Sequence, residues 1–378
     1  MSISEERNQL DQLDEQLVKT FVKRMEKVAV IAEEKKKENT AIKDPARERE
    51  VLHRVTGYGS PQLETYIKTL YQTVFSLSRT YQKSLHSQES PLEKKIREAM
   101  LGAGTGLPRK AVVACQGVEG SYSQLAATRL FSIPSILYFN QFENVFQAVN
   151  KGLCQYGVLP IENSTSGSVP QVYDLMKQYD FHIVKGLRLK VQHHLFAKPG
   201  TSLGDIREIW SHPQALDQCS DFLKALPGVQ VKVCENTALA AKMVAESGQE
   251  GLAAIASSHC GGLYGLIPLK KGVENHGNNY TRFICISKSL EIFGDGDKIS
   301  LMLSVPHEPG ALFDLLSKFA ALGVNVSKIE SRPIPGTDFE FMFYFDLEAS
   351  QGEGSVIHLM GDLEQTLEHF QFLGWYGE

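Results

Sequence analysis

Several polar residues in the first hundred positions have spacings that would bring their side chains together on helices. Asp44, Arg47 and Glu48 stand at positions i, i+3 and i+4, so they share a face, and Ser78 and Gln82 are one turn apart. Cations, amides and hydroxyls on one face can bind a ligand that carries carboxylates. On spacing alone, surface ion pairs are the favoured interpretation, because any charged helix forms them.

Three more cations stand on the segment before these residues. Arg24 and Lys35 are eleven residues apart, almost three helical turns, so they point the same way at about 16 Å along the axis. Only long side chains that lean toward each other could serve one ligand. Arg7 lies too far along the same helix to join them, but a partner chain's helix could supply it.

A second group of polar residues follows apolar strands. In "YGVLPIENSTSGSV" (156–169) a buried strand ends in Glu162, Asn163 and Ser164. Open α/β sheets bind ligands at such strand ends. Similar clusters are "GVEGSYS" (117–123), "SHPQAL" (211–216), "CENTALAA" (234–241) and "NNYTRF" (278–283).

Helix capping is the alternative for these clusters, and it explains about half of their residues. Ser121, Ser168 and Asn236 are plausible N-caps. The Gly120–Ser121 pair also predicts free backbone N–H groups for an anion. Capping explains Thr281-Arg282 poorly, because this pair starts an apolar strand.

The elements that position these residues fall into three zones. Residues 1–100 predict three helices: one over 4–37 with an apolar stripe (Leu10, Leu13, Leu17, Phe21, Met25, Val28), one from Asp44-Pro45, and one from Ser60-Pro61 to His86. A helix of about 45 Å cannot bury its stripe alone, so we expect a bundle between two chains. Residues 101–109 read as a linker, 110–290 as a two-lobed α/β domain with mostly parallel strands, and 297–378 as a ferredoxin-like βαββαβ unit.

Composition excludes several classes of protein. The 378 residues carry a net charge of −5, which gives no signal for a polyanion partner such as nucleic acid. Neither a leader nor a membrane span is predicted. Six scattered cysteines without C-x-x-C pairs favour a reducing cytoplasm. We expect no metal and no cofactor, since His193 and His194 are adjacent and point apart in a strand, and "GAGTGLP" (102–108) follows no strand.

The first hundred residues resemble the all-helical chorismate mutases. That family carries two arginines and a lysine on a long helix, then D-x-x-R-E and S-x-x-x-Q; this chain has Arg7, Arg24 and Lys35, then "DPARE" (44–48) and "SRTYQ" (78–82). The resemblance implies that Arg24, Arg47 and Arg7 of the partner subunit hold carboxylates. It implies that Lys35 and Gln82 donate to the ether oxygen and that Glu48 binds the ring hydroxyl, with Asp44 and Ser78 completing the site. Lys35 is chosen within the run 35–37 by its interval from Arg24. The pericyclic reaction needs no nucleophile, only a fixed conformer and charge stabilisation.

Residues 110–288 resemble prephenate dehydratases, through "GVEGSYS", "PIENS", "HPQAL" and "TRF" in the family's order. The resemblance implies two lobes like those of periplasmic binding proteins, with prephenate between them. It implies that Thr281 assists the departing hydroxyl, with a relay through Glu162 or water, and that Arg282 helps to hold a carboxylate. Further substrate contacts are expected at Ser121, Tyr122, Asn163, Ser164 and Gln214. Ser168 is expected to cap the next helix.

The last zone resembles the ACT regulatory domain of these enzymes. The resemblance places phenylalanine at Gly310, Ala311 and Leu312 and at Glu330, Ser331, Arg332 and Pro333, between two chains.

We therefore expect a homo-oligomeric bifunctional enzyme that takes chorismate through prephenate to phenylpyruvate under feedback by phenylalanine. The alternatives are a dehydratase whose helical zone only dimerises, and a solute-binding module without chemistry. The sequence does not decide between arogenate and prephenate.

Overall fold

The computed structural model describes residues 2–38, 40–86, 89–102, 104, 106–334, 336 and 340–378. Positions 103 and 105 of the predicted linker lie outside the described residues. The chain divides into two compact units: residues 1–94, 305–324 and 354–367, and residues 95–304, 325–353 and 368–378. Within the described ranges, no helix has both the length and the apolar character needed to cross a bilayer.

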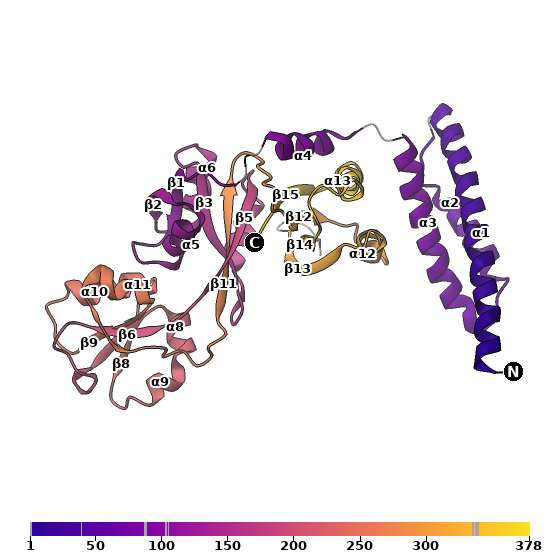
Figure 1. Cartoon of the computed structure of the whole chain (residues 1–378). Coiled ribbons are helices and arrows are strands. Elements are labelled where there is room, and N and C mark those ends of the chain that lie inside the picture. The colour runs from indigo at the N-terminus through magenta and orange to yellow at the C-terminus, as the bar shows by residue number, and fades with distance from the viewer. Residues whose placement is uncertain are drawn as a thin grey trace. The chain divides into compact units, whose positions relative to one another are not determined.

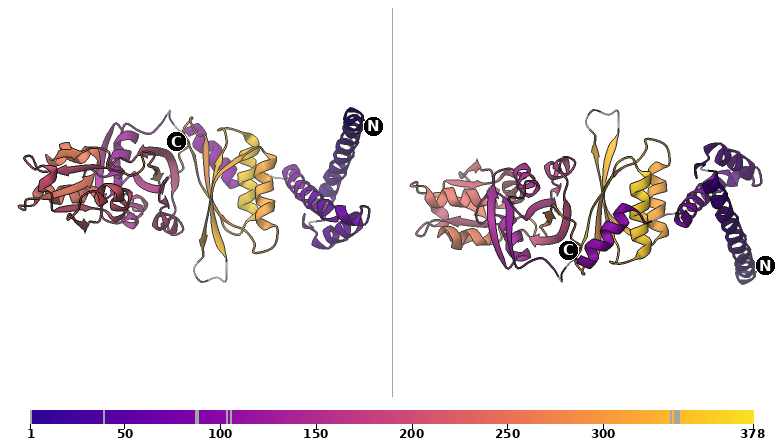
Figure 2. Two further views of the ribbon diagram at one scale, coloured as in Figure 1. Left: turned by 90° about the horizontal axis from the view of Figure 1, so that it is seen from below. Right: turned by 90° about the horizontal axis from the view of Figure 1, so that it is seen from above.

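The helical region contains the three predicted helices. They are α1 (Ile3–Lys37), α2 (Pro45–Thr56) and α3 (Glu64–His86), the last preceded by a 3-10 turn (Pro61–Leu63). Figure 2 shows α1 as one unbroken rod. Asp44 caps α2 by accepting from the backbone N–H of Arg47, and Pro45 occupies the first helical position, as the sequence predicts.

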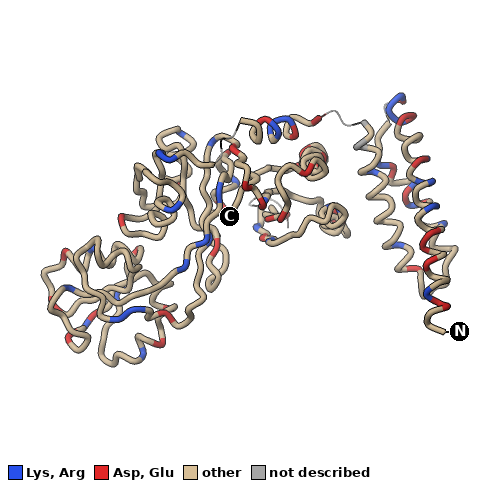
Figure 3. Tube along the Cα trace, viewed as in Figure 1, with Lys and Arg blue, Asp and Glu red and all other residues tan. Residues whose placement is uncertain are grey.

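The apolar stripe of α1 is largely uncovered. Leu10, Leu13 and Leu17 are 57%, 58% and 59% exposed, whereas Val28 and Ala32 are buried. Charged residues are frequent along α1 and sparse along α3 (Figure 3). The N-terminal half of α1 therefore presents an apolar face without a partner among the described residues of one chain.

A further helix, α4 (Pro91–Gly102), was not predicted. The backbone N–H of Glu93 donates to Oγ of Ser90, which begins the helix. The predicted linker started at 101, so its first two residues belong to α4.

The first α/β lobe contains a mixed sheet in the order β2-β1-β3-β11-β5, with the short β4 beside β3. Its strands are β1 (Lys110–Gln116), β2 (Ile133–Phe139), β3 (Tyr156–Asn163), β4 (Gly167–Ser168), β5 (His182–Lys190) and β11 (Tyr280–Ser287), and its helices are α5 (Tyr122–Leu130), α6 (Phe142–Asn150) and α7 (Pro170–Met176). Strands β2, β1 and β3 are parallel, but β11 runs antiparallel to β3 and β5.

The second lobe contains a sheet in the order β10-β6-β9-β7-β8. Its elements are β6 (His194–Ala197), a 3-10 turn (Leu203–Asp205), β7 (Glu208–Ser211), α8 (Pro213–Gln218), α9 (Ser220–Lys224), β8 (Gln230–Val233), α10 (Thr237–Glu246), β9 (Leu252–Ala256), α11 (Ser258–Tyr264) and β10 (Ile267–Lys270). Two segments, 191–193 and 271–279, connect the lobes (Figure 1). The two lobes are confirmed. The prediction of mostly parallel strands is wrong, because β11 inserts antiparallel into the first sheet and β6 runs antiparallel to both β9 and β10 in the second.

The last region confirms the predicted βαββαβ order. It comprises β12 (Lys298–Ser304), α12 (Ala311–Ala321), β13 (Asn325–Pro333), β14 (Phe341–Glu348), α13 (Gly354–Thr366) and β15 (Phe370–Tyr376). The strands form an antiparallel sheet in the order β13-β14-β12-β15, which we call the C-terminal sheet.

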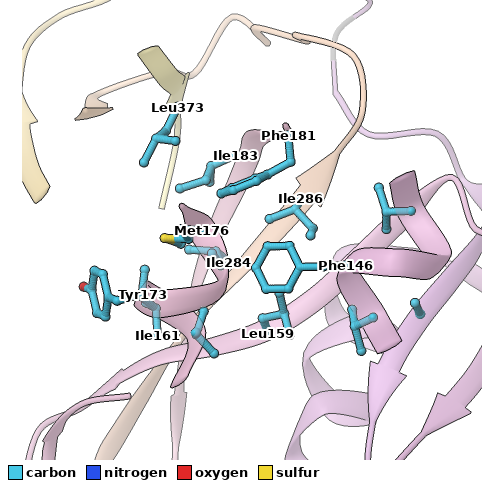
Figure 4. Close-up of a cluster of buried hydrophobic side chains, with 14 of the residues drawn as sticks. Phe146, Leu159, Ile161, Tyr173, Met176, Phe181, Ile183, Ile284, Ile286 and Leu373 are labelled. Carbon is cyan, nitrogen blue, oxygen red and sulfur yellow. The ribbon is translucent and has the colours of Figure 1, made fainter. Parts of the chain in front are cut away.

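The first lobe and the C-terminal sheet share one apolar core (Figure 4). Phe146, Leu159 and Ile284 of the lobe belong to the same buried cluster as Leu373 of β15. The two sheets approach closely, since a Cβ atom added at Gly374 would lie 2.0 Å from the carbonyl oxygen of Ile183. Only glycine fits this position. The packing fixes β5 and its neighbour β11 against the C-terminal sheet.

Candidate active sites

The helical region encloses a cavity of about 450 Å³ between α1, α2 and α3. Seven of the eight side chains predicted for the first site line it: Arg24, Lys35, Asp44, Arg47, Glu48, Ser78 and Gln82. Arg7, near the start of α1, lies outside the cavity. One chain thus brings together every predicted member except the residue expected from a partner.

Helix α3 contributes Ser78 and Gln82 to the cavity, and Ser78 holds the side chain of Arg24. Arg24 donates to Oγ of Ser78, whose own proton goes to the carbonyl of Val74. Burial lowers the pKa of Arg24 from its usual value, against a smaller opposing effect of Tyr71. The side chain of Gln82 is buried, and its Oε1 has no hydrogen-bond partner among the described residues. A buried polar atom of this kind favours a polar ligand in the cavity.

Lys35 is distinguished from the two lysines that follow it. Its Nζ lies 3.0 Å from the carbonyl oxygen of Ala41 and 2.7 Å from that of Ile42. These bonds use two of the three ammonium protons and leave one for a ligand. Lys37 instead pairs with Glu34 on the surface at 2.7 Å.

The carboxylate of Glu48 has a partner that the sequence did not reveal. Arg79 of α3 lies 2.6 Å from Glu48, and both side chains are largely covered. Arg79 also lines the cavity. The neighbouring Arg47 pairs with Glu50 at the exposed side of α2. Arg79 stands between the predicted Ser78 and Gln82, but nothing in its spacing connects it with Glu48 on another helix.

The second candidate site is built on adjacent strand ends. Thr281 of β11 pairs in register with Asn163 of β3, and Nδ2 of Asn163 lies 2.9 Å from Oγ1 of Thr281. Oδ1 of Asn163 accepts from the backbone N–H groups of Thr165 and Ser166, each at 3.0 Å. These two donors fix the orientation of the amide, so Nδ2 must donate to Thr281. The hydroxyl proton of Thr281 is therefore directed away from Asn163.

Other residues predicted for this site hold the polypeptide in place. Ser164 is bonded to the backbone of residues 278 and 280, and Ser121 caps α5. The N–H of Gly120, expected to be free for an anion, donates to Oε1 of Gln124. The hydroxyl of Tyr122 donates to the carbonyl of Gln192 at 2.7 Å, in the segment that connects the lobes, and burial raises its pKa.

In the second lobe, the residue bonded to the strand-end site is Gln218 and not the predicted Gln214. Gln214 lies exposed near the start of α8. Gln218, one turn later, is bonded to Nδ2 of Asn279 at 2.9 Å. Asn279 in turn accepts from Asn163 at 2.7 Å. Asn279 belongs to the cluster "NNYTRF" but was not named as a site residue, and Gln218 was missed because its contacts join segments that are distant in the sequence. The predicted cap at Asn236 is confirmed at the start of α10.

Arg282 and Glu162 lie apart from Thr281, contrary to the expectation that all three serve one ligand. Arg282 is 8% exposed and bonds to Asp346 and to the hydroxyl of Tyr376 in the C-terminal sheet. Its Nε lies 3.2 Å from a carboxylate oxygen of Glu378, an ion pair without hydrogen-bond geometry. Burial acts to lower the pKa of Arg282, but these partners together raise it.

The carboxylate of Glu162 is also turned toward the C-terminal sheet, where it lies 2.7 Å from Nζ of Lys328. Successive side chains of a strand point to opposite faces. Glu162 and Arg282 are register partners on neighbouring strands, so they share the face opposite Asn163 and Thr281. We therefore assign neither residue to the substrate.

Strand β13 meets the first lobe through residues that were predicted to contact phenylalanine. Glu330 accepts from Ser168 at 2.7 Å, and Arg332 lies 2.8 Å from Asp174, whose pKa it lowers by hydrogen bonding. Ser168 was expected to cap the following helix; that prediction is wrong, because α7 begins after Val169 without a side-chain cap. Gly310 precedes α12 with a φ of +92°, a conformation that favours glycine.

Three family models match the chain in succession. Chorismate mutase type II matches residues 6–83, prephenate dehydratase matches 113–291, and the ACT domain matches 299–357. The fold and its two polar sites thus define an enzyme with two catalytic regions and a regulatory one.

Individual relatives agree with this assignment. A bifunctional chorismate mutase/prephenate dehydratase of Aquifex aeolicus is 31% identical over 379 residues, 99% of this chain and 97% of the relative. A chloroplastic arogenate dehydratase/prephenate dehydratase of Arabidopsis thaliana is 36% identical over 313 residues, 79% of this chain and 80% of the relative. The solved structure of prephenate dehydratase from Arthrobacter aurescens in complex with L-Phe is 27% identical, covers 71% of this chain and 90% of its own, and has a TM-score of 0.64.

The chain belongs to the family of bifunctional chorismate mutase/prephenate dehydratases. It has chorismate mutase and prephenate dehydratase activities together with an ACT regulatory domain, and it acts in phenylalanine biosynthesis.

Proposed function

We propose that prephenate loses its ring hydroxyl beside Thr281. The observation that carries this assignment is the fixed direction of the bond from Asn163 to Oγ1 of Thr281. Because Oγ1 accepts there, its proton is available to the departing hydroxyl of the substrate. The ring carbon–oxygen bond and the bond to the ring carboxylate break together, the electron pair enters the aromatic ring, and CO₂ and water leave with phenylpyruvate.

In this role Thr281 stabilises charge and keeps its own proton. A threonine hydroxyl is a weak acid, so full transfer would leave a costly alkoxide. A hydrogen bond to the departing oxygen stabilises the negative charge that develops there, and a solvent proton completes the water. Glu162 takes no part, because its carboxylate pairs with Lys328.

We further propose that chorismate binds in the helical cavity. Arg24 and Arg47 would hold its carboxylates, and Lys35 and Gln82 would donate to the ether oxygen as the bond breaks. Glu48, held by Arg79, would accept from the ring hydroxyl.

We propose that a second copy of the chain completes this cavity with Arg7 of the partner subunit. The exposed leucines 10, 13 and 17 follow Arg7 on α1 and supply an apolar surface for a second helix. Mixing Arg7→Ala protein with Arg24→Ala protein tests this arrangement. Each mixed dimer would contain one site with both arginines intact, so mutase activity should return to about a quarter of the wild-type value after exchange. Activity that stays at the level of the separate variants would exclude a shared site.

Phenylalanine is the proposed effector, at Gly310, Ala311 and Leu312 and at residues 330–333. A relative of known structure was solved with L-Phe. Since Glu330 and Arg332 also contact the first lobe, an effector that moves β13 would change the packing of the dehydratase region. A dehydratase rate that stays constant across a phenylalanine titration would contradict this role.

We also propose a reducing compartment such as the cytoplasm, which suits six free and buried cysteines.

The decisive experiment gives the whole protein chorismate and follows prephenate and phenylpyruvate together. Thr281→Ala should convert chorismate to prephenate normally and then accumulate it, because the mutase site is untouched. Thr281→Ser, which keeps the hydroxyl, should retain much of the dehydratase rate. Near-normal phenylpyruvate formation by Thr281→Ala would remove Thr281 from the mechanism. The same assay with arogenate determines which of the two substrates is preferred.

A further inference from the structure

A chain of hydrogen bonds leads from Thr281 to a buried histidine. Asn163 donates to Thr281 at 2.9 Å and to Oδ1 of Asn279 at 2.7 Å. Nδ2 of Asn279 lies 2.9 Å from Oε1 of Gln218, and the same oxygen lies 2.9 Å from Nε2 of His193. The bonds join β3 and β11 of the first lobe, α8 of the second lobe and both segments that connect the lobes.

The direction of every bond in this chain follows from the one fixed amide. Oδ1 of Asn163 faces two backbone N–H groups, so its Nδ2 is the donor to Asn279. Oδ1 of Asn279 is thereby an acceptor, and its Nδ2 must donate to Oε1 of Gln218. That oxygen has no proton to give, so Nε2 of His193 must carry one. The network selects one tautomer of His193.

Water cannot replace these partners, because the central groups are buried. Asn279 is 2% exposed, His193 is 3% exposed and Asn163 is 6% exposed. The backbone of His193 is held as well, since its N–H donates to Glu274 at 3.0 Å and its carbonyl accepts from Val273. The second ring nitrogen, Nδ1, has no hydrogen-bond partner among the described residues. The imidazole is thus anchored at one functional atom, Nε2.

The charge state of His193 agrees with this tautomer. Burial lowers its pKa, and His194 acts in the same direction; the bond to Gln218 and the carboxylate of Glu274 oppose these effects without reversing them. A neutral ring has one donor and one acceptor nitrogen. The donor is used by Gln218, and Nδ1 keeps its lone pair.

We propose that His193 is a positioning residue for the dehydratase reaction. Its Nε2–H holds Oε1 of Gln218, which holds Asn279 and, through it, the amide of Asn163. Asn163 then keeps donating to Oγ1 of Thr281, so that the threonine proton stays directed toward the departing hydroxyl. The inference rests on the proposed role of Thr281 and adds the group that keeps its hydroxyl oriented.

Two amide substitutions of His193 test whether the reaction depends on a hydrogen-bond donor at the position of Nε2. His193→Gln places an amide nitrogen about as far from the backbone as Nε2, whereas His193→Asn reaches only as far as Nδ1. We expect His193→Gln to keep the dehydratase kcat within about fivefold. We expect His193→Asn to lower kcat about thirtyfold with a smaller change in KM, since a buried partner of the network is left unpaired.

The mutase activity of the same protein and its unfolding transition monitor the fold of each variant. In a Thr281→Ala background, His193→Asn should cause little further loss, because both changes remove one function. A wild-type rate for His193→Asn would overturn the inference. An equal fall in the dehydratase kcat for His193→Gln and His193→Asn would overturn it too. So would a fall caused by His193→Asn in the Thr281→Ala background as large as in the wild type. These results are distinct from failure of the proposed function, which would show as a Thr281→Ala variant with normal dehydratase activity.

Discussion

The two active sites use opposite kinds of side chain. The helical cavity is lined by long charged residues that are covered to different degrees; Arg47 is 54% exposed, whereas Glu48 is 26% exposed. The strand-end site is built from short neutral groups, and Asn163 and Asn279 are almost completely buried. A rearrangement that moves charge within a dicarboxylate needs cations at the right distance, and long flexible side chains can supply them. An elimination needs one proton pointing in one direction, which a buried network of amides can fix.

The largest effect that would sharpen this comparison is expected at Arg24. Arg24→Leu removes a charged donor from the cavity, so mutase kcat/KM should fall about a thousandfold. Dehydratase activity, measured by supplying prephenate, should stay at the wild-type level. The matched variant Arg49→Leu, on the exposed surface of α2, should change neither rate. A dehydratase loss in Arg24→Leu would show that the two sites are not independent.

The second prediction concerns Arg282, a charged residue among the neutral groups of the strand-end region. Arg282→Met leaves the buried Asp346 without its paired cation, while Glu378 keeps Lys298, so the free energy of unfolding should fall by about 3–5 kcal/mol. The control is Arg188→Met, the exposed register partner on β5, which loses a cation–π contact with Tyr280 and should change stability by about 1 kcal/mol or less. Denaturant unfolding measures both. An Arg282→Met protein of normal stability with a raised KM for prephenate would instead restore Arg282 as a substrate ligand.

The third prediction concerns Asn163, whose amide directs the hydroxyl of Thr281. Asn163→Asp can still accept from the two backbone N–H groups but can no longer donate. The hydroxyl of Thr281 would then donate its hydrogen bond to the new carboxylate and not to the substrate, and the dehydratase kcat should fall about a hundredfold. Asn236→Asp is the matched control, since that side chain only accepts as a helix cap and Asp serves equally there. Equal dehydratase rates for Asn163→Asp and Asn236→Asp would contradict the proposal that Asn163 directs the hydroxyl proton of Thr281.

The smallest predicted effect is that of salt. Raising ionic strength from about 0.01 M to about 1 M shortens the Debye length from about 30 Å to about 3 Å. The partly exposed cations of the helical cavity should lose attraction for chorismate, and the mutase KM should rise about threefold. The dehydratase kcat, which depends on buried neutral groups, should change by less than twofold. The reverse order in steady-state assays would break the comparison.

The difference between the sites also explains how far the sequence could predict them. Helical spacing fixes the direction of a side chain, so the face shared by Asp44, Arg47 and Glu48 could be read directly. The interval from Arg24 likewise selected Lys35, which is the lysine of the run 35–37 that lines the cavity. Arg79 was missed because its bond to Glu48 joins two helices, and no periodicity within either one reports on it.

In the strand-end region, one error was avoidable and another was not. Thr281 and Arg282 are adjacent in a strand, so alternation alone places them on opposite faces. Assigning both to one ligand ignored that rule. The partners His193, Gln218 and Asn279 come from segments that only the tertiary fold brings together. The same holds for β11, since an apolar pattern shows that a strand exists but not which way it runs or between which neighbours.

The register of β11 determines which side chain each of its two faces presents. Thr281 serves the polar network on one side, and Arg282 serves Asp346 and Glu378 on the other. Deleting or inserting one residue just before this pair would exchange the two faces. The guanidinium would then face the neutral amides, while the hydroxyl would face Asp346 and Glu378, which would both have lost the guanidinium. A register shift of a single residue at this pair would therefore abolish chemistry and stability together, although every residue of both clusters would still be present.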